Sequence, residues 1–184
     1  MLCGIDEAGR GSIAGDLVVA GVIFNKDEIP KELNDSKKIS EKKRYELFEP
    51  IKNTTHYHIV TISSKQIDED GISLSMKNAL EEIMQNLQAD EYLFDGNTTF
   101  NVKNLQTMVK ADAKVLEVSA ASILAKVTHD INILKDAKKY PEYQFEKHKG
   151  YGTKLHIEKI KKYGYSPVHR KSYKIKALQK TLFE

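Results

Sequence analysis

The feature that most constrains this chain is a short apolar run, residues 2–5, that stops at two adjacent acids, Asp6 and Glu7, and passes into a glycine-rich loop. A second apolar run, at 17–25, is rich in β-branched residues, so both runs are expected to be strands, the first over 1–8. Side chains alternate along a strand, so the two acids cannot both point into a core unless the strand ends there. Carboxylates at a strand end are suitable ligands for Mg²⁺ or Mn²⁺, although an acidic loop after an edge strand would have the same sequence.

The rest of the chain alternates between predicted strands and helices. Apolar alternation and β-branched residues predict strands at 56–62, 91–96 and 105–109. Apolar residues at helical spacing predict one helix that begins near Ser40 and others over 73–88, 118–134 and 153–163. This order indicates an α/β fold with a mixed central sheet flanked by helices and a small helical C-terminal part. No linker composition interrupts the 184 residues, so one domain, 1–184, is expected, with the last ~40 residues as a basic helical extension.

Charge is distributed unevenly along the chain. Residues 126–184 hold 15 Lys/Arg and 6 Asp/Glu, a net charge of +9, whereas residues 1–125 hold 14 and 20, a net charge of −6. This asymmetry suggests catalytic acids beside a surface that attracts a polyanion, although solvated lysines on helix faces would give the same count. The single cysteine, Cys3, fits a reducing compartment, and neither a membrane-spanning run nor a signal segment is recognisable. A cytoplasmic protein is therefore expected.

Two further acids follow predicted strands. Asp95 ends an apolar run and precedes Gly96, and Asp112 comes shortly after the predicted strand at 105–109. If these strands neighbour the first one, their acids converge with the N-terminal pair on one edge of the sheet. Such a group of oxygens suits one or two Mg²⁺ ions, which can activate water for phosphodiester cleavage. Taken alone, the Asp-Gly pair also fits an ordinary turn.

Two segments are suited to holding phosphate. The loop Gly9-Arg10-Gly11 offers backbone N–H groups and a guanidinium, but its glycine spacing and the strand that follows do not fit a dinucleotide-binding motif. The segment 145–156 carries basic residues and places Tyr151 between two glycines before a helix N-terminus. A tyrosine there can present its ring to a sugar or its hydroxyl to a 2′-OH. The alternative is an ordinary lysine-rich loop.

Three histidines, His148, His156 and His169, could be read as zinc ligands. Their spacings fit no closed zinc site, and the chain has no second cysteine. A structural or phosphate-contacting role is therefore preferred.

In their order along the chain, several motifs resemble those of the type 2 ribonucleases H (ribonuclease HII). Between about residues 2 and 173 they are Asp6-Glu7-Ala8-Gly9-Arg10-Gly11, Asn34-Asp35-Ser36-Lys37, Asp95-Gly96, Lys110-Ala111-Asp112, Ser119-Ala120-Ala121-Ser122-Ile123-Leu124-Ala125-Lys126-Val127 and His148-Lys149-Gly150-Tyr151-Gly152-Thr153. The resemblance implies a ribonuclease H-like fold and a Mg²⁺- or Mn²⁺-dependent endonuclease that cleaves the RNA strand of RNA–DNA hybrids. It further implies incision by metal-activated water 5′ to a ribonucleotide embedded in duplex DNA, leaving a 3′-hydroxyl and a 5′-phosphate. The implied role is removal of misincorporated ribonucleotides and RNA primers.

The resemblance also implies a role for individual residues. The catalytic and metal-binding set would be Asp6, Glu7, Asp95 and Asp112. The substrate-binding set would be Gly9, Arg10, Gly11, Lys37, Lys149, Tyr151, His169 and Arg170, with Tyr151 sensing the ribose at the ribo–deoxy junction. The chain departs from the family pattern at Ser12 and Asp16, where proline is usual, and at His129, where arginine is common. These departures concern the stiffness of the glycine loop and one phosphate contact.

The C-terminal segment allows two interpretations. Gln179, Leu182 and Phe183 resemble the Gln-x-x-Leu-Phe peptide that bacterial replication clamps bind, which implies a sliding clamp as partner. Alternatively, the segment is an amphipathic helix that packs on the domain. The protein is expected to be a monomer.

Two other functions stay open. The first is another polynucleotide-cutting enzyme on the same fold, such as a junction resolvase, against which the Tyr151 loop and the motif order argue. The second is a non-catalytic hybrid-binding protein, which would not need the four acids.

Overall fold

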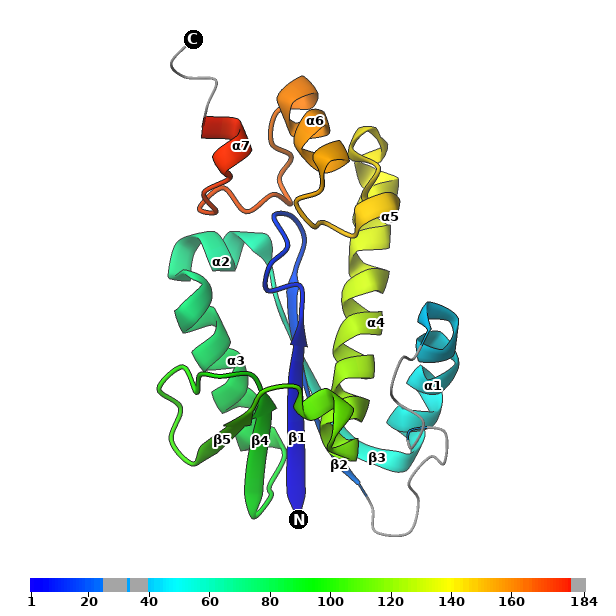
Figure 1. Cartoon of the computed structure of the whole chain (residues 1–184), viewed down its shortest axis with the longest axis vertical. Coiled ribbons are helices and arrows are strands. Elements are labelled where there is room, and N and C mark those ends of the chain that lie inside the picture. The colour runs from blue at the N-terminus through cyan, green and yellow to red at the C-terminus, as the bar shows by residue number, and fades with distance from the viewer. Residues whose placement is uncertain (25–32, 34–39, 180–184) are drawn as a thin grey trace.

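A computed structural model of the chain describes residues 1–24, 33 and 40–179 (Figure 1). Five strands form one mixed sheet in the order β3-β2-β1-β4-β5. They are β1 (Leu2–Ala8), β2 (Leu17–Phe24), β3 (Thr55–Ile62), β4 (Glu91–Asp95) and β5 (Leu105–Met108). The central strand β1 pairs antiparallel with β2 and parallel with β4. The predicted mixed central sheet is thus confirmed, and the strands that carry Asp6 and Asp95 are direct neighbours.

Helices cover both faces of the sheet (Figure 1). The helices α2 (Ser64–Asp70) and α3 (Ile72–Asn86) contribute to the hydrophobic core on one face. The helices α1 (Glu41–Thr54) and α4 (Leu116–Lys139) contribute to the core on the other. The predicted arrangement, a sheet flanked by helices, is therefore confirmed.

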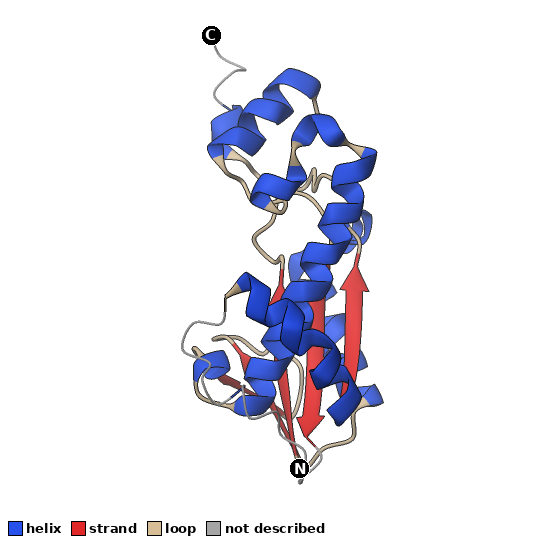
Figure 2. Ribbon diagram, turned by 90° about the vertical axis from the view of Figure 1, so that its right-hand side faces the viewer, coloured by secondary structure: helices blue, strands red, loops and turns tan. Residues whose placement is uncertain are grey.

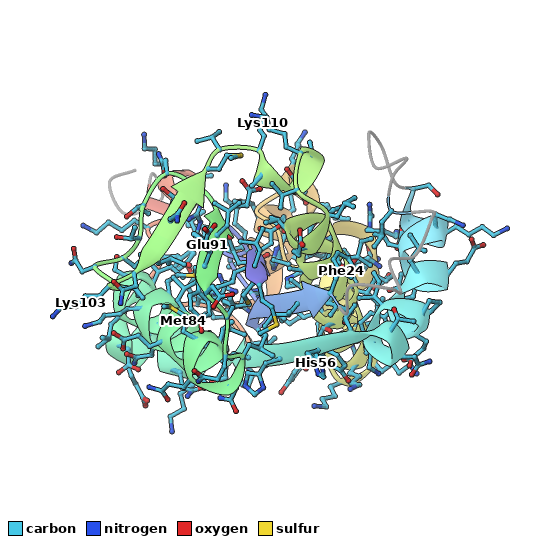
Figure 3. The ribbon with its side chains drawn as sticks, turned by 90° about the horizontal axis from the view of Figure 1, so that it is seen from below. Phe24, His56, Met84, Glu91, Lys103 and Lys110 are labelled. Carbon is cyan, nitrogen blue, oxygen red and sulfur yellow. The ribbon has the colours of Figure 1, made fainter. Side chains whose placement is uncertain are left out.

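Short helices follow α4 at the end of the molecule away from the N-terminus (Figures 1 and 2). They are the 3-10 helix η3 (Pro141–Tyr143), α5 (Phe145–His148), α6 (Lys154–Tyr163) and α7 (Lys176–Gln179). A further 3-10 helix, η2 (Ala111–Ala113), connects β5 to α4. Seen along the sheet from the end where β1 begins, Lys103 and Lys110 project outward from the loops on either side of β5 (Figure 3).

The alternation of side chains along β1 explains how α4 comes close to the acids. Cys3 and Ile5 enter the core on the α3 face, so Gly4 and Asp6 face α4. A Cβ added at Gly4 would lie 2.3 Å from the carbonyl carbon of Glu117, which lies in the first turn of α4. A glycine is needed there because the helix backbone lies directly against the strand.

The first predicted strand, over 1–8, is β1, whose last residues Asp6, Glu7 and Ala8 pair with β2. Some helix boundaries were predicted wrongly. The helix predicted over 73–88 is α3, and a separate helix, α2, precedes it with a capping box between Ser63 and Gln66. The predicted helix over 118–134 extends further at both ends. Among the helices of residues 40–179, none combines the length and apolarity that crossing a bilayer demands.

Candidate active site

Asp6 of β1 and Asp95, the last residue of β4, lie side by side on two neighbouring parallel strands. Ile5 of β1 is paired with Phe94 of β4, so the next residue of each strand occupies the equivalent position. The pleat turns both carboxylates toward the α4 face of the sheet. This is the convergence of strand-end acids that the sequence predicts for these two residues.

Asp95 connects the sheet to the segment that carries Asp112. Its Oδ1 accepts a hydrogen bond from the backbone N–H of Ala111 at 3.1 Å. Ala111 begins the 3-10 helix η2, and Asp112 is the next residue in it. The acids of β1, β4 and η2 are close enough that Asp95 and Asp112 both raise the pKa of Asp6.

The acids repel one another. Burial, followed by repulsion from Glu7, raises the pKa of Asp6 well above its ordinary range. Burial raises the pKa of Glu7 as well, although the guanidinium of Arg10 opposes the shift. Burial and the nearby Asp112 raise the pKa of Asp95. A cation placed among these groups would relieve the repulsion and favour their charged forms.

The chemistry of this acid cluster fits a hard divalent cation. All four side chains offer carboxylate oxygens, which Mg²⁺ and Mn²⁺ prefer, and none offers sulfur or imidazole nitrogen. Within residues 1–24 and 40–179, no three His, Cys, Asp or Glu side chains stand close enough to form a ready metal cluster, and this includes the three histidines considered for zinc. The fit to a divalent ion therefore rests on the chemistry of the four carboxylates and on the repulsion between them.

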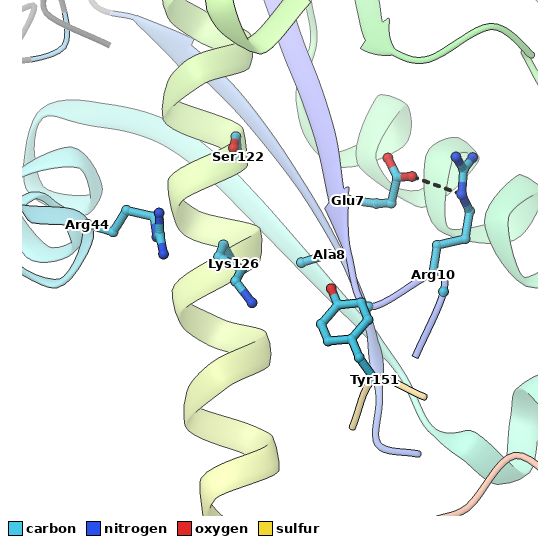
Figure 4. Close-up of a pocket in the computed structure, with 9 residues that line it drawn as sticks. Glu7, Ala8, Arg10, Arg44, Ser122, Lys126 and Tyr151 are labelled. Atoms are coloured by element: carbon cyan, nitrogen blue, oxygen red, sulfur yellow. Dashed lines mark ion pairs between the residues drawn. The ribbon is translucent and has the colours of Figure 1, made fainter. Parts of the chain in front are cut away.

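The glycine loop after β1 is fixed by packing and by an ion pair. Gly9 has φ +85°, and a Cβ there would lie 2.5 Å from Cδ2 of His129. Arg10 is exposed, and its Nε donates to Oε1 of Glu7 at 3.1 Å (Figure 4). Gly11 is exposed, with nothing within 4 Å of an added Cβ. The loop thus has one tightly packed glycine and one that faces open space.

A cavity of about 410 Å³ opens between this loop and α4 (Figure 4). The loop residues 8–11 and Glu7 line it together with Arg44 of α1, Ser122 and Lys126 of α4, and Tyr151. Lys126 lies with its Nζ 5.5 Å from the centre of the Tyr151 ring. The cavity is therefore polar and positively charged on the side opposite Glu7, and it is lined both by this one acid of the cluster and by the predicted ribose-sensing tyrosine.

Three lining residues, Arg44, Ser122 and Lys126, had no role in the sequence prediction. Ser122 and Lys126 are four positions apart on one helix, so their placement in a shared motif could have indicated a common face. Arg44 belongs to a different helix and to none of the recognised motifs, so no sequence signal pointed to it.

Tyr151 is held against the glycine loop by backbone contacts. Its neighbour Gly150 has φ +82°, and a Cβ there would lie 2.3 Å from the carbonyl oxygen of Ala14. The N–H of Ile13 donates to the carbonyl of Gly150 at 2.9 Å, and Ser12 forms an isolated bridge with Tyr151. The two segments predicted to hold phosphate are therefore packed on each other.

The remaining predicted substrate-binding residues differ in their placement. Lys149 is half-buried beside the Tyr151 loop, and Lys37 lies outside the described residues. His169 and Arg170 are 1% and 0% exposed. Arg170 donates from Nε to the carbonyl of Gly15 at 3.0 Å and from Nη1 to that of Arg10 at 3.2 Å. Both buried side chains thus contact the protein behind the cavity, and Arg170 holds the glycine loop from inside.

Two positions that depart from the family pattern meet under the loop. His129 is buried, and its Nε2 lies 3.5 Å from Oγ of Ser12. Its Nδ1 lies 3.1 Å from Oδ1 of Asp130, which also pairs with Lys126 at 2.8 Å. Burial alone would raise the pKa of Asp130, but hydrogen bonds with His129 and Lys126 lower it below its ordinary value. This buried ion pair orients the lysine that lines the cavity.

Comparison with known proteins identifies similar chains along nearly the whole length. The family model for Ribonuclease HII matches residues 3–176. Ribonuclease HII of Sulfurovum sp. (strain NBC37-1) is 55% identical over 184 residues, covering 99% of this chain and 96% of that protein. Ribonuclease HII of Aliarcobacter butzleri (strain RM4018) is 54% identical over 191 residues, covering 99% and 98%.

Solved structures have the same architecture. The ribonuclease HII in the PCNA:RNase HII complex from Archaeoglobus fulgidus superposes with a TM-score of 0.81 at 28% identity, covering 95% of this chain and 96% of that one. The ribonuclease H2 from Pyrococcus horikoshii OT3 gives a TM-score of 0.77 at 28% identity, covering 97% and 95%. The predicted ribonuclease H-like fold is confirmed.

Proposed function

Because this chain belongs to the ribonuclease HII family and is a ribonuclease H endonuclease, we propose that it cuts DNA duplexes 5′ to an embedded ribonucleotide, as well as the RNA strand of RNA–DNA hybrids. The products would be a 3′-hydroxyl and a 5′-phosphate. The observation that carries the proposal is the cavity in which Glu7, the neighbour of Asp6, and Tyr151 line one space together with the basic side chains of Lys126 and Arg44. The biological role would be removal of misincorporated ribonucleotides and RNA primers.

In this proposal the acids hold Mg²⁺ or Mn²⁺. Asp6, Glu7, Asp95 and Asp112 provide the oxygen ligands, and their mutual repulsion favours taking up a cation. When bound, the ion activates water and stabilises the leaving oxygen. The ion pair with Arg10 orients the carboxylate of Glu7, which lines the cavity. No side-chain nucleophile is required.

The cavity wall would bind the nucleic-acid strand. Gly9 and Gly11 would offer backbone N–H groups and Arg10 a guanidinium to the phosphates around the ribonucleotide. Lys126 and Arg44 would add positive charge on the opposite side. Tyr151 would place its ring or hydroxyl against the ribose, where a 2′-OH distinguishes RNA from DNA.

The other residues of the predicted binding set would act around this cavity. Lys149 and Lys37 would contact phosphates further along the strand. Arg170 and His169 would support the loops from behind, since burial withdraws both side chains from the surface.

The acid assignment is tested by two conservative variants. Asp6→Asn and Asp95→Asn should each lower kcat on an RNA–DNA hybrid by at least about 10²-fold, because an amide cannot replace a charged metal ligand. The matched control is Asp70→Asn, which makes the same change at an exposed position at the end of α2 and should keep full activity. Thermal unfolding would verify that all three fold. Near wild-type cleavage by either active-site variant would refute the assignment.

A sliding clamp is the proposed protein partner. The solved relative from Archaeoglobus fulgidus was determined as a PCNA:RNase HII complex. In this chain Gln179 ends α7, while Leu182 and Phe183 lie outside the described residues. A pull-down with a bacterial clamp should retain the whole chain and lose it when residues 179–184 are deleted; no retention of the whole chain would contradict this part.

A monomeric state and a cytoplasmic location remain predictions from the sequence.

A further inference from the structure

Three buried histidines lie directly behind Tyr151. His156 is 0% and His169 1% exposed, and the His148 ring stacks on His156 with 4.2 Å between centroids. The Tyr143 ring lies 4.8 Å from that of His169. None of these imidazoles lines the cavity described above. The hydrogen bonds of His169 and His156 lead from the C-terminal segment to the backbone of Tyr151.

The hydrogen-bond partners determine which nitrogen of each ring carries the proton. The backbone N–H of Ser166 donates to Nδ1 of His169 at 2.9 Å, so this nitrogen is unprotonated. The proton of a neutral His169 is then on Nε2, which lies 3.0 Å from Nε2 of His156. His156 therefore accepts at Nε2 and carries its own proton on Nδ1, 3.0 Å from the carbonyl oxygen of Tyr151.

This series of hydrogen bonds runs in one direction, from His169 through His156 to Tyr151, and it requires both rings to be neutral. A second proton on His156 would place an N–H group opposite the N–H of His169. A second proton on His169 would place an N–H group opposite the backbone N–H of Ser166. Burial lowers the pKa of both His156 and His169 to about 4, so both rings are neutral near pH 7. The series of hydrogen bonds is therefore intact near pH 7.

The series of hydrogen bonds ends at the backbone of Tyr151, which two further hydrogen bonds hold in place. The carbonyl of Tyr151 also accepts from the N–H of Thr153 at 2.8 Å, and the N–H of Tyr151 donates to the carbonyl of His148 at 2.9 Å. We propose that His156 and His169 are positioning residues for ribonucleotide recognition, because their hydrogen-bond chain fixes the Tyr151 backbone and so the place of its ring in the cavity. This inference rests on the proposed function, in which Tyr151 faces the ribose.

Two substitutions of His156 separate this role from simple packing. In His156→Asn the amide nitrogen is as many bonds from the backbone as Nδ1 and can still donate to Tyr151. In His156→Gln the amide oxygen can take the place of Nε2 and accept from His169, so that contact is kept and the donor to Tyr151 is lost. The readout is the ratio of kcat/KM on a DNA duplex with one ribonucleotide to that on a continuous RNA–DNA hybrid, with Mg²⁺. Activity on the hybrid controls for folding within each variant.

We expect His156→Gln to lower this ratio about tenfold, the effect of one lost hydrogen bond, and His156→Asn to keep it within about threefold of wild type. In a Tyr151→Ala background the glutamine substitution should have no further effect on the ratio, since the histidine acts through the tyrosine. If His156→Gln does not fold, His169→Asn takes its place, because it keeps an acceptor for Ser166 and removes the donor to His156.

Equal losses in the Asn and Gln variants would overturn the inference, as would a loss that persists without the Tyr151 side chain. Failure of the proposed function would look different. In that case Tyr151→Ala alone would leave the ratio unchanged.

Discussion

At the scale of single residues, the two adjacent acids of β1 have different surroundings. Alternation along the strand turns Asp6 toward α4, where it is 8% exposed, and turns Glu7 to the other side, where it reaches Arg10. The pKa of Asp6 is accordingly raised by every other acid of the cluster, whereas the largest charge effect on the pKa of Glu7 comes from the cation Arg10 and lowers it. Asp6 is thus the buried centre of the cluster, and Glu7 connects it to the glycine loop.

The glycines of that loop give a prediction with an internal control. Gly9→Ala should lower the free energy of unfolding by about 1–3 kcal/mol, because φ is +85° and the new Cβ would meet the buried His129. Gly11→Ala should change it by less than about 0.5 kcal/mol, since nothing lies within 4 Å of an added Cβ. Urea unfolding of the two variants measures the difference. Similar effects at both positions would show that the loop is not packed on His129.

Much of this residue-scale arrangement could be predicted from the sequence, and some could not. Asp6 and Asp95 were predictable because each stands where an apolar run stops. The burial of Arg170 was not, because a basic residue near the C-terminus is ordinarily read as a phosphate contact. Its hydrogen bonds go to carbonyls about 155 positions earlier in the chain, and no local pattern records such a pairing.

At the scale of elements, β1 and β4 bring the acids together, and the helices after α4 hold the tyrosine. The order of strands in the sheet depends on pairings between segments far apart in the chain. From the sequence, the pairing of β1 with β4 could therefore be stated only as a condition. The extent of β1 was predicted, and its last residues are held in extended form by pairing with β2. Helix α2 was missed although Ser63 and Gln66 form a capping box that marks its start.

His156 of α6 and His169, which follows α6, predict how this part of the molecule responds to acid. His156 and His169 have pKa values of about 4 in the folded protein, against about 6.5 in an unfolded chain. Between these values the unfolded state binds more protons, so stability is full above pH 6.5 and is lost as the pH falls toward 4. Each histidine contributes about 1.4 kcal/mol per pH unit in this window.

The measurement compares wild type with His156→Asn by urea unfolding at several pH values between 7.5 and 4.5. The raised pKa values of Asp6, Glu7 and Asp95 act in the opposite direction, but they are common to both proteins and cancel in the difference. On acidification the free energy of unfolding should fall less steeply in the variant, by an amount that corresponds to about one proton fewer taken up on unfolding. Parallel curves would show that His156 does not titrate in this window.

At the scale of the whole molecule, the site is assembled from segments along almost the entire chain. The cavity draws residues from β1, α1, α4 and the Tyr151 loop (Figure 4). The sequence predicted the fold class and, through the order of its motifs, the family, because both depend on patterns that a linear chain retains. It did not predict Arg44 as a lining residue, because its approach depends on how α1 packs beside α4.

The most direct test of the account is to map the cut on an end-labelled DNA duplex with one internal ribonucleotide. An all-DNA duplex and a continuous RNA–DNA hybrid serve as controls, each with Mg²⁺, Mn²⁺ or EDTA. The account predicts a single metal-dependent cut on the 5′ side of the ribonucleotide, no cut in all-DNA and cleavage of the hybrid. Cleavage of the hybrid alone would contradict recognition of the ribose by Tyr151, and no cleavage of either ribonucleotide-containing substrate would contradict the proposed active site.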